Sequence, residues 1–329
     1  MQTPSTISTP LQINQVVIWG HKLHTHTHSY IHNGFFIAFN HLGYKTLWLD
    51  DNDDVSNIDF SNSFFITEHQ VNKKIPCRKD CLYLSHYVDN GDYPGVPIEN
   101  IIILKVSKRD FYEPDKDLNK NYQYTALQYG QKFEYYSQIN NYNCFYMYWA
   151  TDLLPPQIDE NIKKLHITNS SSQINFIGCM TNVWNDFYQI ISKIGMQFNH
   201  YGGTFDKNSS KNKTIEENVE LIKKSFISPA LQDDKQIKYK YIPCRIFKNI
   251  SYGKMGLTNN PIVQELFDNK LIYDSDLFML INKGLQFESS TDKNTIVKEL
   301  MEIVRDNHTY LNRIFSIQRF IQDYTSFLL

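Results

Sequence analysis

Arg245 opens the stretch of this sequence in which residue types and spacing most clearly suggest chemistry. After it, Ile246 and Ile250 have the spacing of a buried helix face, and Gly253 marks the end of that helix. A guanidinium offers forked donors, and the start of a helix adds free N–H groups and a partial positive charge, so the pattern suits a bound diphosphate. By spacing alone, an arginine that pairs with a carboxylate on a surface helix is the simpler interpretation.

Five of the eleven histidines lie in the segment 21–34. His24, His26 and His28 alternate with threonines, so their imidazoles would share one face of an extended chain and could ligate a transition metal. Each of them could also be an ordinary loop histidine that is solvated or hydrogen-bonded.

The length and charge of the chain exclude several classes of protein. At 329 residues the sequence suits two domains of about 150 residues each. The net charge of −2 provides no global basic field for nucleic acid or an anionic membrane. Five cysteines, an odd number, argue against a disulfide framework. The N-terminus is polar and no apolar run is long enough to span a membrane, so we expect a cytoplasmic protein.

The first half of the sequence has the pattern of a βαβ unit. A strand at 16–19 is followed by the histidine segment, a helix at 35–42 that ends at Gly43, and a strand at 45–49. Sheets built from such units bind ligands at the carboxyl ends of their strands. Short apolar runs continue the α/β pattern at 64–66, 81–84, 101–104 and 145–149. The paired prolines after Asp152 indicate a domain boundary.

A second strand–loop–helix–strand pattern begins after that boundary. The strand at 174–177, the loop at Gly178, the helix at 184–194 and the strand at 198–201 repeat the order of the first half. We therefore predict an α/β protein with two nucleotide-fold halves that face each other. The remaining predicted elements are strands at 226–232, 239–242 and 257–258, a helix at 216–224, a helix cap at 274–276, and a mostly helical region from 296 to 329.

Two C-terminal segments resemble GT-B glycosyltransferases, especially their spore-protein-like bacterial and large-virus members. The first segment follows the family's order of an arginine, a helix that ends in a small residue and a glycine, an apolar pair and a polar residue. The residues that fit this order here are Arg245, Ser251, Gly253, Leu257, Thr258 and Asn259. The second, His308-Thr309-Tyr310 followed by Arg313, resembles the closing helix of these enzymes. The family usually has a glutamate three residues after the arginine, where this sequence has Lys248.

The resemblance implies two Rossmann-like lobes that face a cleft, with a C-terminal helix that crosses back to the first lobe. Residues 1–168 together with 314–329 would form the acceptor-side lobe, and residues 169–313 would bind a nucleotide-sugar. The implied reaction transfers a hexosyl or pentosyl group from the nucleotide-sugar to a glycan or other hydroxyl acceptor. It requires no metal or other cofactor, and neither nucleic acid nor a membrane is expected as a partner.

The same resemblance assigns roles to individual residues. Arg245 and Lys248 would neutralise the departing diphosphate. The general base would be His28 or, as second candidate, His26, because the pKa of histidine lies near the operating pH. Asp152 is the carboxylate alternative. The other implied donor contacts are Ser251, Gly253, Thr258, Asn259, Gly178, Thr181 and Asn182.

Two other functions remain open at this point. A histidine pair after a first strand also resembles metal-dependent amidohydrolases, so His24, His26 and His28 could belong to a hydrolase. That class uses a closed barrel of eight βα units, which the two-half pattern does not predict. A non-catalytic protein that binds a sugar or nucleotide is the other alternative, because Lys248 replaces the usual glutamate.

Overall fold

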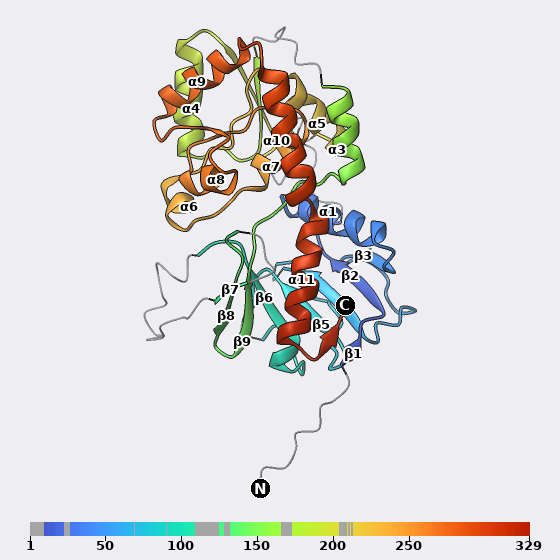
Figure 1. The fold of residues 1–329 in the computed structure, drawn as a ribbon. Helices are drawn as coiled ribbons and strands as arrows, with labels where there is room; N and C mark the ends of the chain where they lie inside the picture. The colour runs from blue at the N-terminus through green and yellow to red at the C-terminus, as the bar shows by residue number, and fades with distance from the viewer. Residues whose placement is uncertain are drawn as a thin grey trace.

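The computed structural model describes residues 10–22, 27–68, 70–89, 91–108, 125–127, 132–165, 173–203, 209, 211 and 213–329. Figure 1 shows two lobes, the first built on a broad sheet and the second mainly on helices. The chain passes from the first lobe to the second just before α3 (Pro155–Lys163) and returns between α10 (Lys293–Asn307) and α11 (Tyr310–Tyr324). The predicted architecture of two facing α/β lobes is confirmed.

An eight-stranded sheet with the order β3-β2-β4-β5-β6-β9-β8-β7 forms the first lobe. The strands from β3 to β9 in this order are parallel, and β8 and β7 continue the sheet in antiparallel fashion. Because β2 is flanked by β3 on one side and β4 on the other, the chain reverses direction across the sheet between β2 and β4. The bounds are β2 (Gln15–Trp19), β3 (Thr46–Leu49), β4 (Ser63–Thr67), β5 (Leu82–Ser85), β6 (Ile101–Lys105), β7 (Thr125–Ala126), β8 (Tyr135–Ile139) and β9 (Tyr142–Tyr146).

Both faces of this sheet are buried, as alternation along each strand requires. Val16 and Ile18 face α1 (Thr27–His41) and α11, whereas Val17 and Trp19 face the opposite side. On that opposite side the covering residues come from connecting segments, such as Phe60 and Tyr93. The short 3-10 helix η1 (Ile98–Asn100) directly precedes β6. The two terminal strands β1 (Leu11–Gln12) and β14 (Phe327–Leu328) pair in parallel beside the lobe.

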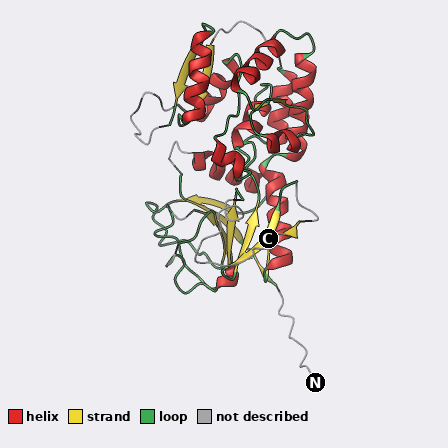
Figure 2. Ribbon diagram, turned by 90° about the vertical axis from the view of Figure 1, so that its left-hand side faces the viewer, coloured by secondary structure: helices red, strands yellow, loops and turns green. Residues whose placement is uncertain are grey.

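The second lobe contains two short parallel strand pairs surrounded by helices (Figure 2). The strand pairs are β10 (Gln173–Ile177) with β11 (Gln197–Tyr201), and β12 (Leu257–Thr258) with β13 (Ile272–Tyr273). The helices are α3, α4 (Asn182–Lys193), α5 (Ile215–Lys224), α6 (Asp234–Lys238), α7 (Cys244–Ser251), α8 (Pro261–Leu266), α9 (Leu277–Glu288) and α10. No helix in the described residues has the length and apolar character needed to cross a membrane.

The hydrophobic cores of the two lobes place both lobe boundaries at earlier residues than the sequence analysis predicts. Ile158 of α3 belongs to the core of the second lobe, and Tyr310 at the start of α11 belongs to that of the first. The chain therefore changes lobe near residues 151 and 309, where Thr151 and Thr309 form a parallel bridge, instead of at 168 and 314. The paired prolines 155 and 156 begin α3, because proline fits the first helical turn.

Three predicted elements differ from the structure. The helix predicted from residue 35 begins at Thr27, so His28 and His32 are helical instead of lying in a loop. Residues 239–240 form a turn and 241–242 have no regular structure, where a strand was expected, because the cap of Asp233 on Gln236 stabilises the helix 234–238 directly before them. Residues 226–232 carry only one bridge, between Ala230 and Thr258.

Candidate active site between the lobes

A cavity of about 170 Å³ lies between the two lobes. Thr27 and Tyr30, at the start of α1, line it from the first lobe, and every other lining residue belongs to the second. The second-lobe residues come mainly from the carboxyl ends of β10 and β11 and from the first turns of α7. Ligand sites in parallel α/β folds lie at this edge of the sheet. The cavity thus has the position expected for a nucleotide site.

Arg245 occupies the first turn of α7, and its side chain lines the cavity. Its Cζ lies 4.5 Å from the ring centroid of Phe176 and 5.2 Å from that of Trp184, and these two rings stack on each other. Among the described residues no carboxylate pairs with the guanidinium. Burial lowers the pKa of Arg245 to about 10, because desolvation disfavours the charged form. An incoming phosphate would supply the missing negative charge.

The loop after β10 comes close to this guanidinium. Gly178 has a φ of +138°, and a Cβ at this position would lie 2.6 Å from Nη2 of Arg245. His200 fixes the loop, since its Nε2 donates to the carbonyl oxygen of Gly178 at 2.7 Å. Glycine is therefore needed here both for the backbone conformation and for the space that Arg245 uses.

Lys248 lies one turn beyond Arg245 and lines the same cavity. Its Nζ lies 3.6 Å from the ring centroid of Tyr30 and 3.9 Å from Oδ2 of Asp152. The other carboxylate oxygen of Asp152 accepts a hydrogen bond of 2.6 Å from Tyr252. Asp152 does not line the cavity, so its contacts suit the positioning of Lys248 better than the deprotonation of an acceptor.

Tyr30 also joins the two lobes. Its hydroxyl accepts a hydrogen bond from Asn218 of α5, so the side chains of α1 and α5 meet at the wall of the cavity. Burial raises the pKa of Tyr30, and the residue is neutral at physiological pH. This contact holds the first-lobe wall of the cavity against the second lobe.

The structure separates the other predicted donor residues from the cavity. The amide of Asn259 is used within the chain, because it accepts from the backbone N–H of Gln232 and donates to its carbonyl oxygen. The hydroxyl of Ser251 lies 2.7 Å from that of Thr151. Of the seven donor contacts implied beside Arg245 and Lys248, only Gly178 lines the cavity, and the six that do not are Ser251, Gly253, Thr258, Asn259, Thr181 and Asn182.

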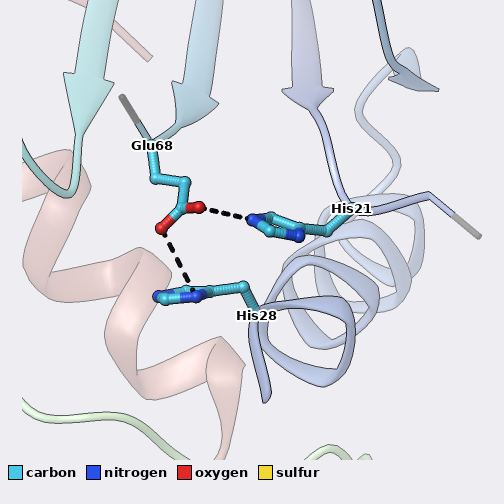
Figure 3. A group of neighbouring side chains, drawn as sticks. All are labelled: His21, His28 and Glu68. Atoms are coloured by element: carbon cyan, nitrogen blue, oxygen red, sulfur yellow. Dashed lines mark hydrogen bonds and ion pairs between the residues drawn. The ribbon is translucent and has the colours of Figure 1, made fainter. Parts of the chain in front are cut away.

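A cluster of histidines around Glu68 lies at the carboxyl edge of the first-lobe sheet. His21, Glu68 and His86 follow β2, β4 and β5, and His28 approaches them from the first turn of α1. Figure 3 shows the carboxylate of Glu68 between two imidazoles, with Oε1 2.7 Å from Nε2 of His21 and Oε2 3.4 Å from Nδ1 of His28. Nε2 of His28 lies 3.1 Å from Nδ1 of His86.

The surroundings of His28 make it a weak base. Burial lowers its pKa to about 3, although the charge of Glu68 acts in the opposite direction. Burial disfavours ionisation of Glu68, but the hydrogen bond from His21 and the neighbouring imidazoles outweigh it and lower the pKa of Glu68 to about 2. A general base works best with a pKa near the operating pH, so the structure does not favour His28 for that role. His24 and His26 lie outside the described residues.

Sequence reasoning missed several residues that line or border the site. Phe176 and Trp184 were assigned only to a strand and a helix, and Tyr30 and Asn218 received no role. Glu68 received no role either, although it directly follows the apolar run 64–66 and Thr67. The rule that ligand sites lie beyond the carboxyl ends of parallel strands would have identified it.

Comparisons with known proteins bear on the fold. No protein-family model and no curated protein matches the sequence. Among solved structures, an α-glucosyltransferase in complex with UDP and a 13-mer DNA that contains an HMU base superposes with a TM-score of 0.55 at 10% identity, over 93% of this chain and 98% of that chain.

Two structures of α1,3-fucosyltransferase are less similar. One has a TM-score of 0.42 at 10% identity and covers 94% of each chain. The other, with GDP-fucose, has a TM-score of 0.39 at 10% identity and covers 97% of this chain and 94% of that one. With the two facing lobes and the α-glucosyltransferase superposition taken together, the chain has the GT-B fold that is found in nucleotide-sugar glycosyltransferases.

Proposed function

We propose that this protein is a glycosyltransferase that moves a hexosyl or pentosyl group from a nucleotide-sugar to a hydroxyl acceptor, such as a glycan. The observation that carries the proposal is the guanidinium of Arg245, which lines a cavity between two GT-B lobes and has no carboxylate partner among the described residues. Within this fold class the segments 245–259 and 308–313 resemble the spore-protein-like and large-virus members. A cytoplasmic location remains part of the proposal.

The donor side of the reaction is assigned to residues of α7 and the loop after β10. Arg245 and Lys248 would hold the diphosphate and stabilise the negative charge that develops on it as the sugar leaves. The backbone of Gly178 lies close enough to Arg245 to contact the same phosphates. Two cations at this place would perform the charge neutralisation that a metal ion performs in other transferases, so we propose that the diphosphate is bound without a metal.

The acceptor side is assigned to the first lobe. Thr27 and Tyr30 form the only first-lobe wall of the cavity among the described residues, and the acceptor hydroxyl would approach across them. Asp152 would hold Lys248 in place from the lobe boundary, at 3.9 Å. His28 lies between Thr27 and Tyr30 in sequence and next to Glu68, which is the basis for the inference in the following subsection.

Nucleotide binding is the most direct test of this function. Thermal-shift and calorimetric titrations with UDP, GDP, dTDP and CMP, and then with their sugars, identify the donor. UDP comes first, because the α-glucosyltransferase neighbour was solved with it. Its DNA with an HMU base makes a hydroxylated DNA one acceptor to include beside glycans.

Arg245→Ala connects the binding to chemistry. The variant should lose about 100-fold or more of the transfer rate with the identified donor, because it removes a preorganised charge from the leaving group. Arg319→Ala, an exposed arginine of α11, is the matched control and should behave as the wild type. Transfer by Arg245→Ala at the wild-type rate would overturn the assignment.

A non-catalytic binding protein is the second candidate, and Lys248 in place of the family's glutamate is the observation that favours it. Such a protein would bind a nucleotide-sugar but leave it intact. Slow release of free sugar during prolonged incubation with the donor that binds, abolished in Arg245→Ala, would exclude this candidate and support the transferase.

A further inference from the structure

The histidine cluster of the first lobe offers a ligand set that the proposed donor chemistry does not use. We propose that His21, His28 and Glu68 bind a divalent transition metal ion, with Zn²⁺ as the reference ion, beside the first-lobe wall of the cavity. Two imidazoles and a carboxylate are a common ligand set for Zn²⁺ in proteins, and three protein ligands leave a fourth position for water or a ligand oxygen.

The positions of the ligand atoms fit such an ion. One atom of each of the three side chains lies within 4.8 Å of the other two. Nε2 of His21 lies 2.7 Å from Oε1 of Glu68, and Nδ1 of His28 lies 3.4 Å from Oε2. Ligand atoms about 2.0–2.2 Å from a tetrahedral Zn²⁺ lie about 3.4 Å from one another. The separation at His28 already has this value, and at His21, which contacts the other carboxylate oxygen, the side chains would move apart to admit the ion.

The charge of the cluster also calls for a cation. Glu68 is buried, with only 4% of its surface exposed. Among the described residues its ion-pair partners are His21 and His28, and no lysine or arginine pairs with it. Burial of an anion is costly unless a cation compensates it. A divalent ion bound by neutral imidazoles and this carboxylate would supply that compensation.

The place of the cluster in the fold is the one where open α/β sheets bind ligands. His21 and Glu68 follow β2 and β4, the two neighbouring strands between which the chain reverses direction across the sheet. The turn after β2 is built for this arrangement, because Gly20 and His21 have φ values of +91° and +57°. A Cβ on Gly20 would lie 2.1 Å from Cγ2 of Val71, so only glycine fits.

Neighbouring residues orient the ligands, as in known metal sites. Metal-bound histidines usually hydrogen-bond a second group through their other ring nitrogen. Nε2 of His28 has His86 in this position, at 3.1 Å. The ring of His32 packs edge-on against His21, while its Nδ1 donates to the carbonyl oxygen of Gly20 at 2.8 Å. Trp149 packs edge-on against both His28 and His86.

This site is separate from the diphosphate contacts of Arg245 and Lys248. It lies on the first-lobe side, because His28 stands between the cavity-lining residues Thr27 and Tyr30. A metal here would lie on the side of the acceptor, where it could bind an acceptor oxygen, and it would not replace the cations of α7. The proposal concerns metal binding itself, so it can fail while the proposed function stands.

Direct metal titration tests the proposal. Full-length protein, stripped with a chelator and then dialysed, is titrated with Co²⁺ while its visible absorption is recorded, and with Zn²⁺ in competition with a chromophoric chelator. We expect one ion per chain. Glu68→Gln and His28→Ala should each weaken binding about 100-fold or more, and His86→Ala about 10-fold. His41→Ala, at the exposed end of α1, should bind as the wild type does.

Two outcomes would overturn the proposal. Wild-type protein that takes up no Co²⁺ or Zn²⁺ at micromolar free concentration has no such site, whatever the variants do. Equal affinity of wild type and Glu68→Gln would show adventitious binding to histidines elsewhere. Circular dichroism confirms that each variant is folded, and Glu68→Gln keeps the shape of the side chain if His28→Ala does not fold. Nucleotide titrations of the same stripped protein show separately whether the donor site is intact.

Discussion

Arg245 and Arg313 both have their guanidinium close to an aromatic ring. Arg245 belongs to α7 of the second lobe, and Arg313 belongs to α11, which packs on the first. Arg313 of α11 is fully buried, with its Cζ 4.1 Å from the ring centroid of Tyr148 and Nη1 3.6 Å from Oε1 of Glu134. Arg245 lies 4.5 Å from the ring of Phe176, but it lines a cavity and no described carboxylate pairs with it. One arginine has its counterion within the chain, and the other leaves that position to a ligand.

Burial and aromatic contact therefore do not by themselves identify a binding arginine. Both residues belong to segments that resemble glycosyltransferases, and both have their guanidinium over a ring. The counterion and the cavity separate a structural role from a candidate functional one. Four measurements test this distinction.

The largest effect is expected for Arg313→Met. The substitution removes the Arg313 cation from the buried carboxylate of Glu134, which should lower the free energy of unfolding by about 3–5 kcal/mol. Urea denaturation measures this loss. The double variant Arg313→Met with Glu134→Gln removes the uncompensated charge and should recover at least half of it. A single variant as stable as the wild type would mean that this ion pair has no structural role.

Arg245→Met should have the opposite pattern. Loss of a charge-assisted contact should reduce the affinity for the nucleoside diphosphate by about 1.5–3 kcal/mol, or roughly 10- to 100-fold. Stability should be unchanged or higher, because the lowered pKa of Arg245 shows that the folded protein disfavours this charge. Calorimetry with the nucleotide and urea denaturation of the same samples measure both. A variant that unfolds as readily as Arg313→Met would remove the distinction.

His308, at the return from the second lobe, should make stability depend on pH. Burial and the nearby charge of Arg313 hold its pKa well below the ordinary value of 6.5. Below that value the unfolded chain takes up a proton that the folded protein does not, so this stability is present above pH 6.5 and is lost as the pH falls. Replacement by Gln should reduce the slope of unfolding free energy with pH by up to about 1.4 kcal/mol per unit in the acidic range.

The control for this measurement is the wild type itself, because His28 and His32 also have lowered pKa values and contribute with the same sign. Only the difference between the two slopes reports on His308. Parallel curves from pH 7 to pH 4 would show that this imidazole does not titrate differently in the folded and unfolded chains.

Lys248→Met should give the smallest effect. Lys248 already interacts with Asp152 at 3.9 Å and with the ring of Tyr30, so its removal should weaken nucleotide binding by only about 1 kcal/mol, less than is typical of a contact to a charged group. Lys298→Met, on the exposed surface of α10, provides the matched control. A loss equal to that of Arg245→Met would show that the two cations act as one unit.

The parts of the fold that the sequence predicted correctly are those with local signals. The strand 174–177, the helix that follows it and the strand 198–201 have apolar spacing and glycine stops that act over a few residues, and they appear as β10, α4 and β11. The helix after Arg245 is likewise present as α7. A local cap was also decisive where the prediction failed, since Asp233 and Gln236 cap the helix 234–238 directly before the predicted strand 239–242.

The histidine cluster around Glu68 was harder to predict, because the order of the strands in the sheet brings its residues together. His21 and Glu68 are 47 residues apart in sequence, and no spacing rule links them. They meet because β2 and β4 are neighbours in the sheet, which only the topology shows. The roles given to Thr258 and Asn259 came from the resemblance to GT-B glycosyltransferases, whereas their burial is decided by contacts with Ala230 and Gln232. Arg245 could be identified from the sequence because the segment that contains it resembles GT-B glycosyltransferases.

The two passages between the lobes are adjacent in space. Thr151 donates its N–H to the carbonyl oxygen of His308 at 3.0 Å and pairs with Thr309, so both connections run through one small buried patch. A change in the angle between the lobes would therefore bend the chain at this patch. The hydroxyl of Thr151 also lies 2.7 Å from that of Ser251 in the last turn of α7, so the patch is connected directly to the helix that carries Arg245 and Lys248. Opening and closing of the two lobes would thus be coupled to the position of the two residues that we propose hold the phosphates.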